Sequence, residues 1–298
     1  MGIAVRRGGL VSRAVALLAL ATLLAAAPAP RAAEPNSRGG SSTRPEVRLV
    51  DLPARVASHA KRLGPTVDYI DKYFDSPEVS VYAHVFGPQK TCPLHLHRTT
   101  RELTVVASGE ARVRHVYGRG GRLAQSDGRF AAGVLIYSPP LCAHEWTNAS
   151  TSAPLGVLVL ALPRWDGNTR VAADDPRLAQ APPPLIHRSL ARVAPRIKTN
   201  VHIEKLRVDA AETSELVLRA AWTAPAAPGE SRVYFVVAGE GELEQGARYP
   251  LRPGLLAVVP SAGTTTRLRP FAGQTLVVRA FHIAPGTRPT PPAAERIP

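Results

Sequence analysis

The chain has 298 residues, which is long enough for two small β-domains with apolar cores of their own. Its formal net charge is +14, yet only five of its 37 basic residues are lysines, so the charge comes mainly from scattered arginines. These arginines form neither a basic helix nor a stripe interleaved with aromatic residues, and we therefore expect no nucleic-acid partner. A basic surface still favours small anionic ligands.

Residues 1–33 are typical of an export signal, a signal peptide. Arg6 and Arg7 give it a basic start, residues 14–27 are predominantly apolar, and small residues up to Ala33 offer a cleavage site. This apolar run is shorter than the roughly twenty residues that cross a membrane, so we expect no stable membrane insertion. We expect an exported protein, periplasmic or extracellular, that follows either an ordinary secretory route or a twin-arginine route.

Residues 34–45 are rich in Gly, Ser and Pro and predict a flexible linker. The first globular domain is expected over residues 46–163. It opens with a strand at 47–52 and a helix at 53–63, which has Pro in its first turn.

Residues 78–86 alternate in a strand pattern, and one of the two faces carries Tyr82 and His84. These two side chains face a pocket only if that face is the interior one. A structural role for His84 is the simpler interpretation.

Chemistry-bearing side chains concentrate between Cys92 and Asn148. His95 and His97 are two residues apart, so on a strand their side chains share one face. Glu102 opens the next predicted strand, and His144 lies on a later one. Three imidazoles and one carboxylate, brought together by strand pairing, suit one divalent transition metal such as Fe, Mn, Ni, Zn or Cu.

The spacing of these residues resembles the two conserved motifs of the cupin superfamily. The matching positions are His95, His97, Glu102 and Gly109 in the first motif, and Gly133, Pro139, His144 and Asn148 in the second. The resemblance implies a jelly-roll β-barrel whose metal ligands are His95, His97, Glu102 and His144. Two glycine positions of the motifs hold Gln89 and Leu141, so we expect the turns there to be built differently.

Further strands complete this first domain. They are expected at 102–107, 110–117, 134–137 and 155–162, with His144, Trp146 and Asn148 on one face of another strand. His115 occupies an alternating position and is interpreted as structural. Trp146 either walls the pocket or fills the core.

The chain has two cysteines, Cys92 and Cys142, each within three residues of a predicted ligand. In an oxidising compartment the two thiols could form a disulfide. The alternatives are two buried small side chains or a thiol beside the metal. The sequence leaves these possibilities open.

Residues 164–184 read as a Pro-rich linker, and residues 185–284 predict a second domain that repeats the first in outline. Strands are expected at 201–208, 216–222, 233–238, 255–259 and 275–283, followed by a disordered tail at 285–298.

Aligning the glycine turns of the two halves shows what replaces the ligands. Arg232 falls at the position of Glu102, Thr265 at that of His144, and Pro225 and Ala227 at those of the two other histidines. The fold class predicted for the whole chain is therefore all-β, with two tandem jelly-roll barrels that form a bicupin. One site is intact and the other degenerate, and edges are shared between the halves or with a second subunit in a homodimer.

Three functions follow from this interpretation. The first is a metal-dependent enzyme, a dioxygenase, decarboxylase or isomerase, that acts on a small-molecule substrate. The second is a non-catalytic protein of the cell envelope that binds a metal or a small ligand. The third is a structural barrel with a relic site. No second carboxylate in the sequence is well placed to act as an acid–base partner, so no catalytic residue is assigned.

Overall fold

The computed structural model describes residues 47–283, apart from 209–210, 226–227 and 260–264. The predicted export signal, the linker at 34–45 and the tail at 285–298 lie outside the described residues. No helix in the described part of the chain is long and apolar enough to cross a membrane.

The first half of the chain forms two antiparallel sheets, which together we call the first barrel. Its inner sheet has the strand order β12-β8-β5-β10-β3-β2, and its outer sheet has the order β11-β4-β9-β6-β7. Aromatic and aliphatic side chains such as Phe86, Ile136 and Trp146 fill the space between the two sheets. The strands are β2 (Asp68–Asp75), β3 (Ser80–Phe86), β4 (Thr91–Leu96), β5 (Arg101–Ser108), β6 (Glu110–Arg119), β7 (Arg122–Ala131), β8 (Leu135–Ser138), β9 (Ala143–Asn148), β10 (Leu155–Leu162), β11 (Thr169–Arg170) and β12 (Leu185–His187).

The second half forms a second pair of antiparallel sheets, the second barrel. Its inner sheet has the order β1-β19-β16-β21-β14-β13, and its outer sheet has the order β15-β20-β17-β18. Leu216, Tyr234, Leu243 and Leu268 lie in the core between them. The strands are β1 (Arg48–Asp51), β13 (Val201–Val208), β14 (Ala211–Leu218), β15 (Trp222–Ala224), β16 (Ser231–Ala238), β17 (Gly241–Gln245), β18 (Ala247–Leu251), β19 (Leu255–Val259), β20 (Thr266–Pro270) and β21 (Leu276–Ile283).

The two inner sheets share an apolar core. Leu103 and Leu158 of the first barrel belong to the same buried cluster as Phe235 and Phe281 of the second. Strand β10, whose sequence is LGVLVLAL, is buried at every residue because both of its faces are covered. A strand covered on both faces reads as a continuous apolar run rather than as an alternating pattern.

Two strands cross between the halves of the chain. Strand β1 precedes the first barrel in sequence but pairs with β19 of the second. Strand β12 follows the first barrel's other strands, after the loop at 171–184, and pairs back onto β8. The two halves therefore share sheet edges, which is one of the two arrangements that the sequence suggested. Each inner sheet takes one edge strand from the other half of the chain.

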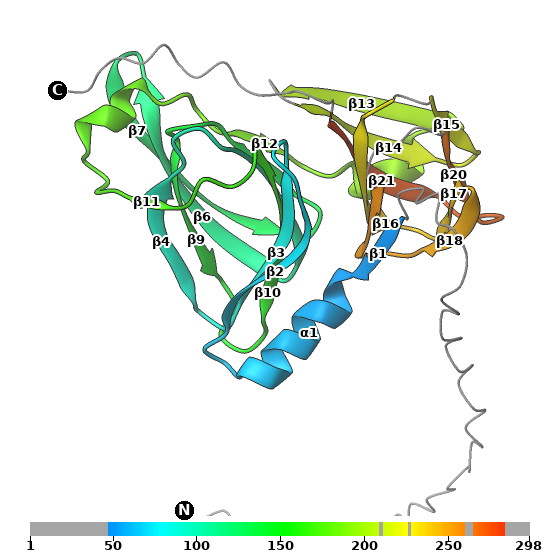
Figure 1. Ribbon diagram of the computed structural model, residues 1–298, viewed down its shortest axis with the longest axis horizontal. Helices are drawn as coiled ribbons and strands as arrows, with labels where there is room; N and C mark the ends of the chain where they lie inside the picture. Colours follow the sequence, from blue (N-terminus) through cyan, green and yellow to red (C-terminus); the bar gives the residue numbers. More distant parts are fainter. Residues whose placement is uncertain (1–46, 209–210, 226–227, 260–264, 284–298) are drawn as a thin grey trace, which may run out of the picture. The chain divides into compact units, whose positions relative to one another are not determined.

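One α-helix, α1 (Leu52–Leu63), connects β1 to the first barrel and is drawn in blue in Figure 1. The Asp51 side chain caps it by accepting a hydrogen bond from the Ala54 amide at 3.0 Å, and Pro53 lies in the first turn. Val56 packs on Val67 and Val85. Three short 3-10 helices complete the fold, η1 (Pro176–Gln180), η2 (Leu190–Arg192) and η3 (Ala194–Arg196).

The prediction of a mostly β chain is confirmed, and several strand positions agree closely with it, such as 155–162, 201–208 and 255–259. Strand β7 was not predicted because its exposed residues alternate with partly buried ones and few of them are apolar. Strand β2 was missed for a similar reason, since four of its eight residues are charged.

Candidate metal centre

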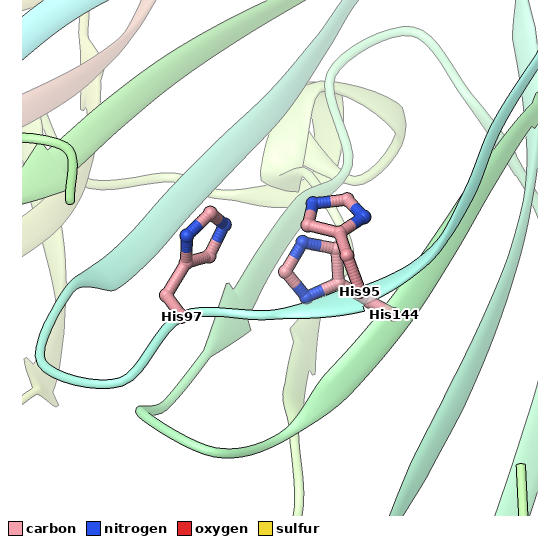
Figure 2. A group of neighbouring side chains, drawn as sticks. All are labelled: His95, His97 and His144. Carbon is pink, nitrogen blue, oxygen red and sulfur yellow. The ribbon is translucent and has the colours of Figure 1, made fainter. Parts of the chain in front are cut away.

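Three histidines converge inside the first barrel. His95 on β4 lies directly opposite His144 on β9, and His97 follows the last residue of β4. All three are buried, and one ligand atom of each lies within 4.8 Å of the others. Figure 2 shows the three imidazole rings close together, and we call this group the histidine cluster.

Glu102 reaches the same point from strand β5 of the inner sheet. Its Oε1 lies 3.2 Å from Nε2 of His97, and its Oε2 lies 3.1 Å from Nε2 of His144. The Tyr82 hydroxyl donates a hydrogen bond of 3.0 Å to Oε1. The structure therefore brings together all four residues that the sequence nominated as ligands.

Backbone carbonyls fix the orientation of each ring. Nδ1 of His95 lies 2.8 Å from the Pro93 oxygen, Nδ1 of His144 lies 3.3 Å from the Cys142 oxygen, and Nδ1 of His97 lies 2.8 Å from the Gly167 oxygen. A carbonyl can only accept, so each Nδ1–H donates, and Nε2 of the neutral ring keeps its lone pair, as in protein metal sites.

Two of these Nε2 atoms, in His97 and His144, are buried and make no hydrogen bond within the described structure, although carboxylate oxygens lie close to them. Lone pairs facing carboxylate oxygens repel one another unless a proton, as the raised pKa of His97 allows, or a metal ion lies between them. Imidazole and carboxylate donors of this kind suit Fe, Mn, Ni, Zn or Cu, so the residues fit a divalent transition metal.

Burial and neighbouring charges separate the pKa values of the histidines. Burial lowers the pKa of His97, but the carboxylates of Glu102 and Asp166 outweigh it and raise the value to about 10. Burial and the charge of His144 lower the pKa of His95 to about 3. Burial raises the pKa of Glu102, but His97 and His144 hold it well below the usual range, so the carboxylate stays ionised.

A cavity of about 40 Å³ opens beside the histidine cluster. Its walls are largely aromatic and include Tyr82, Phe86, Trp146 and Trp165. The face of β3 that carries Tyr82 and His84 is thus the one that lines the pocket. Trp146 fulfils both of its suggested roles, because it lines the cavity and also belongs to the buried core.

The loop after β10 contributes residues that the sequence analysis assigned to a linker. Asp166 lies 3.3 Å from Nδ1 of His97 and accepts two hydrogen bonds of 2.9 Å from Thr99. Burial raises the pKa of Asp166, but these partners lower it below the ordinary value. Trp165 and Asn168 of the same loop line the cavity. These loop residues lie outside any periodic sequence pattern, so no signal in the sequence indicated that they belong to the site.

The two cysteines are free and buried, so the alternative of a disulfide is excluded in this structure. Cys92 lies close to the site, with its sulfur 3.8 Å from Nδ1 of His95. Burial raises the pKa of Cys92 to about 11 and that of Cys142 to about 12. Both side chains are therefore neutral thiols near neutral pH.

The second barrel has lost the ligands. Arg232 occupies on β16 the place of Glu102 on β5, as predicted. Thr266, rather than the predicted Thr265, corresponds to His144, because the pairing of β20 with β17 places it one residue later. The sequence between Pro260 and Thr266 is one residue longer than that between Pro139 and His144.

The counterpart of His95 also differs from the prediction by one residue, in the opposite direction along the chain. Ala224 pairs with Thr266 as His95 pairs with His144, so Ala224 rather than the predicted Pro225 stands at the position of His95. Ala227, the predicted counterpart of His97, lies outside the described residues.

The two substituted glycine positions keep the glycine-like backbone. Gln89 has φ 56° and Leu141 has φ 68°, the only residues other than glycine with positive φ in the described parts of the chain. We expected these turns to differ from turns with glycine. That expectation is wrong for the φ angle, because both residues adopt the left-handed conformation that glycine favours. Leu141 also donates its amide to the His97 carbonyl at 2.8 Å, which links this turn to the site.

No protein-family model and no curated protein matches this chain. Solved structures do. Salicylate 1,2-dioxygenase from Pseudaminobacter salicylatoxidans is 15% identical with a TM-score of 0.57, over 80% of this chain and 84% of that one. A cupin 2 conserved barrel domain protein from Leptotrichia buccalis is 10% identical with a TM-score of 0.54, over 82% of this chain and all of that one.

The sheets, the histidine cluster and these similarities together define the class of protein: the chain has a cupin fold, as the sequence motifs indicated. Its arrangement of two barrels is similar to that of the salicylate 1,2-dioxygenase. A variant of that dioxygenase has also been solved in complex with gentisate, and it is 14% identical to this chain with a TM-score of 0.56.

Proposed function

We propose that this protein is an exported metal-dependent enzyme that acts on a small molecule, with one divalent transition metal held by His95, His97, Glu102 and His144. The observation that carries the proposal is the pair of buried Nε2 atoms, in His97 and His144, that have no hydrogen-bond partner in the described structure and face a carboxylate. Bound there, the metal would supply a Lewis acid and, except for zinc, a redox-active centre.

The surrounding residues prepare this site for binding. The Tyr82 hydroxyl orients Glu102, and Asp166 with the Gly167 carbonyl orients His97. Such partners of ligands typically strengthen metal affinity about 10- to 100-fold. Trp146 and Trp165 limit the access of water to a small cavity, which restricts the substrate to a compact molecule.

A dioxygenase is the favoured reaction class within this proposal. The support is the similarity in fold to salicylate 1,2-dioxygenase, together with aromatic walls that suit a planar ring. The identity of the two chains is only 15%, so the substrate does not follow from the similarity.

Two measurements test the proposal. Elemental mass spectrometry of the purified protein should find about one metal ion per chain in the wild type and far less in His144→Ala. Oxygen uptake should then depend on that metal when phenols, diketones and dicarboxylates are screened. Metal binding without turnover of any of these compounds would favour the non-catalytic envelope protein, and an absence of metal even after reconstitution would refute the site.

Export is a separate part of the proposal and rests on the composition of residues 1–33. Fractionation of cells that produce the full chain should place the processed protein outside the cytoplasm. Replacing Arg6 and Arg7 by lysine should block a twin-arginine route but leave an ordinary secretory route intact. An unprocessed cytoplasmic protein would contradict the proposal.

A further inference from the structure

A second pair of chemical groups lies beside the same cavity, away from the predicted ligands: His84 lines the cavity, and Asp68 contacts His84. Asp68 at the start of β2 and His84 on β3 lie on the same face, because Asp68 pairs with Phe86 and Ile70 pairs with His84. Oδ1 of Asp68 lies 2.6 Å from Nε2 of His84. The sequence analysis treated His84 as structural and did not single out Asp68.

His84 is held from two sides. Its ring packs on Phe86 with the ring centroids 3.9 Å apart, and its Nε2–H donates to Asp68. Its side chain is 16% exposed, and the residue lines the cavity. Within the described structure, Nδ1 of His84 makes no hydrogen bond. The ring thus keeps one acceptor, Nδ1, without a protein partner, on a residue that lines the pocket.

Another Asp–His pair in the chain shows the contrast. His59 on α1 contacts Asp71 through Nε2 at 3.0 Å, but its Nδ1 lies 3.1 Å from Nη2 of Arg62. Both nitrogens of His59 are used, and this residue does not line the cavity. The His59 pair therefore connects α1 to β2. In the His84 pair, by contrast, Nδ1 of His84 has no protein partner in the described structure.

The distance along β3 between two residues that line the cavity gives a length scale for a ligand. Tyr82 and His84 share a face and are two residues apart, which is about 7 Å along a strand. Tyr82 already contacts Glu102 through its hydroxyl. A single six-membered ring with one substituent at each end spans such a distance, and the aromatic walls suit its faces.

We propose that Asp68 and His84 form an acid–base pair that recognises an ionisable hydroxyl group on a small aromatic ligand, while the opposite end of that ligand faces the histidine cluster. Nδ1 of His84 accepts a hydrogen bond from the hydroxyl and then its proton: the O–H bond breaks, an N–H bond forms, and the electron pair stays on the ligand oxygen. Asp68 stabilises the resulting imidazolium. This inference rests on the proposed function and names the substrate class for it.

The charges around the pair support this role. The hydrogen bond from His84 lowers the pKa of Asp68 against the opposing effect of burial, so the carboxylate is ionised. Lys90 lies 4.0 Å from its second oxygen, and Arg170 also lowers its pKa. The other ionisable groups of the cavity wall are Tyr82, Cys92, His95, Glu102 and His144.

Calorimetric titration of the zinc-loaded protein tests the proposal. The probes are 4-hydroxybenzoate and benzoate, which differ only in the hydroxyl, and the variants are His84→Gln, Asp68→Asn and His59→Gln as the matched control. In the wild type the hydroxyl should raise affinity about tenfold. The advantage should vanish in His84→Gln and persist in His59→Gln.

Asp68→Asn separates orientation from charge. The amide oxygen still accepts from Nε2, but the imidazolium loses its counter-charge, so the hydroxyl advantage should fall between that of the wild type and that of His84→Gln. An equal advantage in the wild type and in His84→Gln would overturn the proposal, as would a failure of the zinc-loaded wild type to bind either acid. Loss of zinc from the wild type would instead refute the metal site itself, and zinc content is therefore measured for every variant.

Discussion

Arg232 occupies in the second barrel the position that Glu102 occupies in the first: each is the second residue of an interior strand of an inner sheet. The guanidinium of Arg232 is 1% exposed and donates to Glu230 at 2.7 Å and to Thr266 at 3.3 Å. The positively charged guanidinium of Arg232 thus lies at the position in the second barrel that corresponds to the predicted metal ligands of the first. This relationship has consequences for both barrels.

The first prediction concerns metal stoichiometry. Because Arg232, Thr266 and Ala224 replace the ligands of the second barrel, the chain should bind about one metal ion rather than two. Glu102→Gln, which keeps the shape of the side chain, should weaken metal binding strongly. His115→Gln is the control, because His115 is also buried but its ring lies 6.3 Å from that of His144 and outside the histidine cluster. Elemental analysis after dialysis measures both effects.

The second prediction concerns the stability of the second barrel. Arg232→Met removes the cation beside Glu230, which also contacts His282 at 2.9 Å, and should lower the free energy of unfolding by about 3 kcal/mol. Adding Glu230→Gln should restore part of the loss. Urea denaturation measures both, with the exposed Arg248→Met as control. Equal stability of wild type and Arg232→Met would contradict the prediction.

The third prediction concerns Tyr82. Tyr82→Phe removes the hydroxyl that donates to Glu102 but keeps the aromatic wall. Metal affinity should fall about tenfold, because a ligand has lost its orienting partner. A competitive chelator titration measures the affinity. An unchanged value would show that Glu102 is held well enough by the histidines alone.

The fourth prediction concerns the thiols. Because burial raises the pKa of both cysteines, a thiol reagent at pH 8 should react slowly with the folded protein and should modify two thiols after denaturation. Intact mass after alkylation in denaturant provides the same count. A mass lower by two hydrogens with no alkylation would reveal a disulfide and contradict the structure.

The fifth prediction uses the turn at Leu141, whose φ is 68°. The left-handed conformation costs a residue with a β-carbon roughly 1–2 kcal/mol, whereas glycine adopts it freely. Leu141→Gly should therefore stabilise the fold by about 0.5–1 kcal/mol, after the greater entropy of glycine in the unfolded chain is subtracted. Leu141→Ala keeps the cost and should give no gain. Thermal and urea unfolding measure the difference.

Much of the first barrel could be predicted because its chemistry is local in sequence. His95 and His97 share a strand face, and the strand that carries Glu102 is strongly apolar. The positions of Asp68 and Asp166 could not be predicted, since one begins a strand rich in charged residues and the other lies in a loop. Only strand pairing and a close contact with His97 show that they belong near the cavity.

The degenerate barrel was harder to align. Its loss of ligands followed from the glycine turns, but the counterpart of His144 was misplaced by one residue. A side chain's face changes with every residue of a strand, so a single insertion in a loop exchanges an exposed position for a buried one. Thr265 is exposed and Thr266 is fully buried, as this rule requires.

Strands β1 and β12 each complete a sheet in the other half of the chain. If the chain were cut just before β12, the first inner sheet would lose its edge strand β12. The second inner sheet would lose its edge strand β1. The histidine-bearing half is therefore not an independently folding unit that recombination could transfer to another protein. Deletion of the degenerate half would expose the apolar surface that the two inner sheets share. This interdependence gives a physical reason why a barrel without ligands persists in the chain.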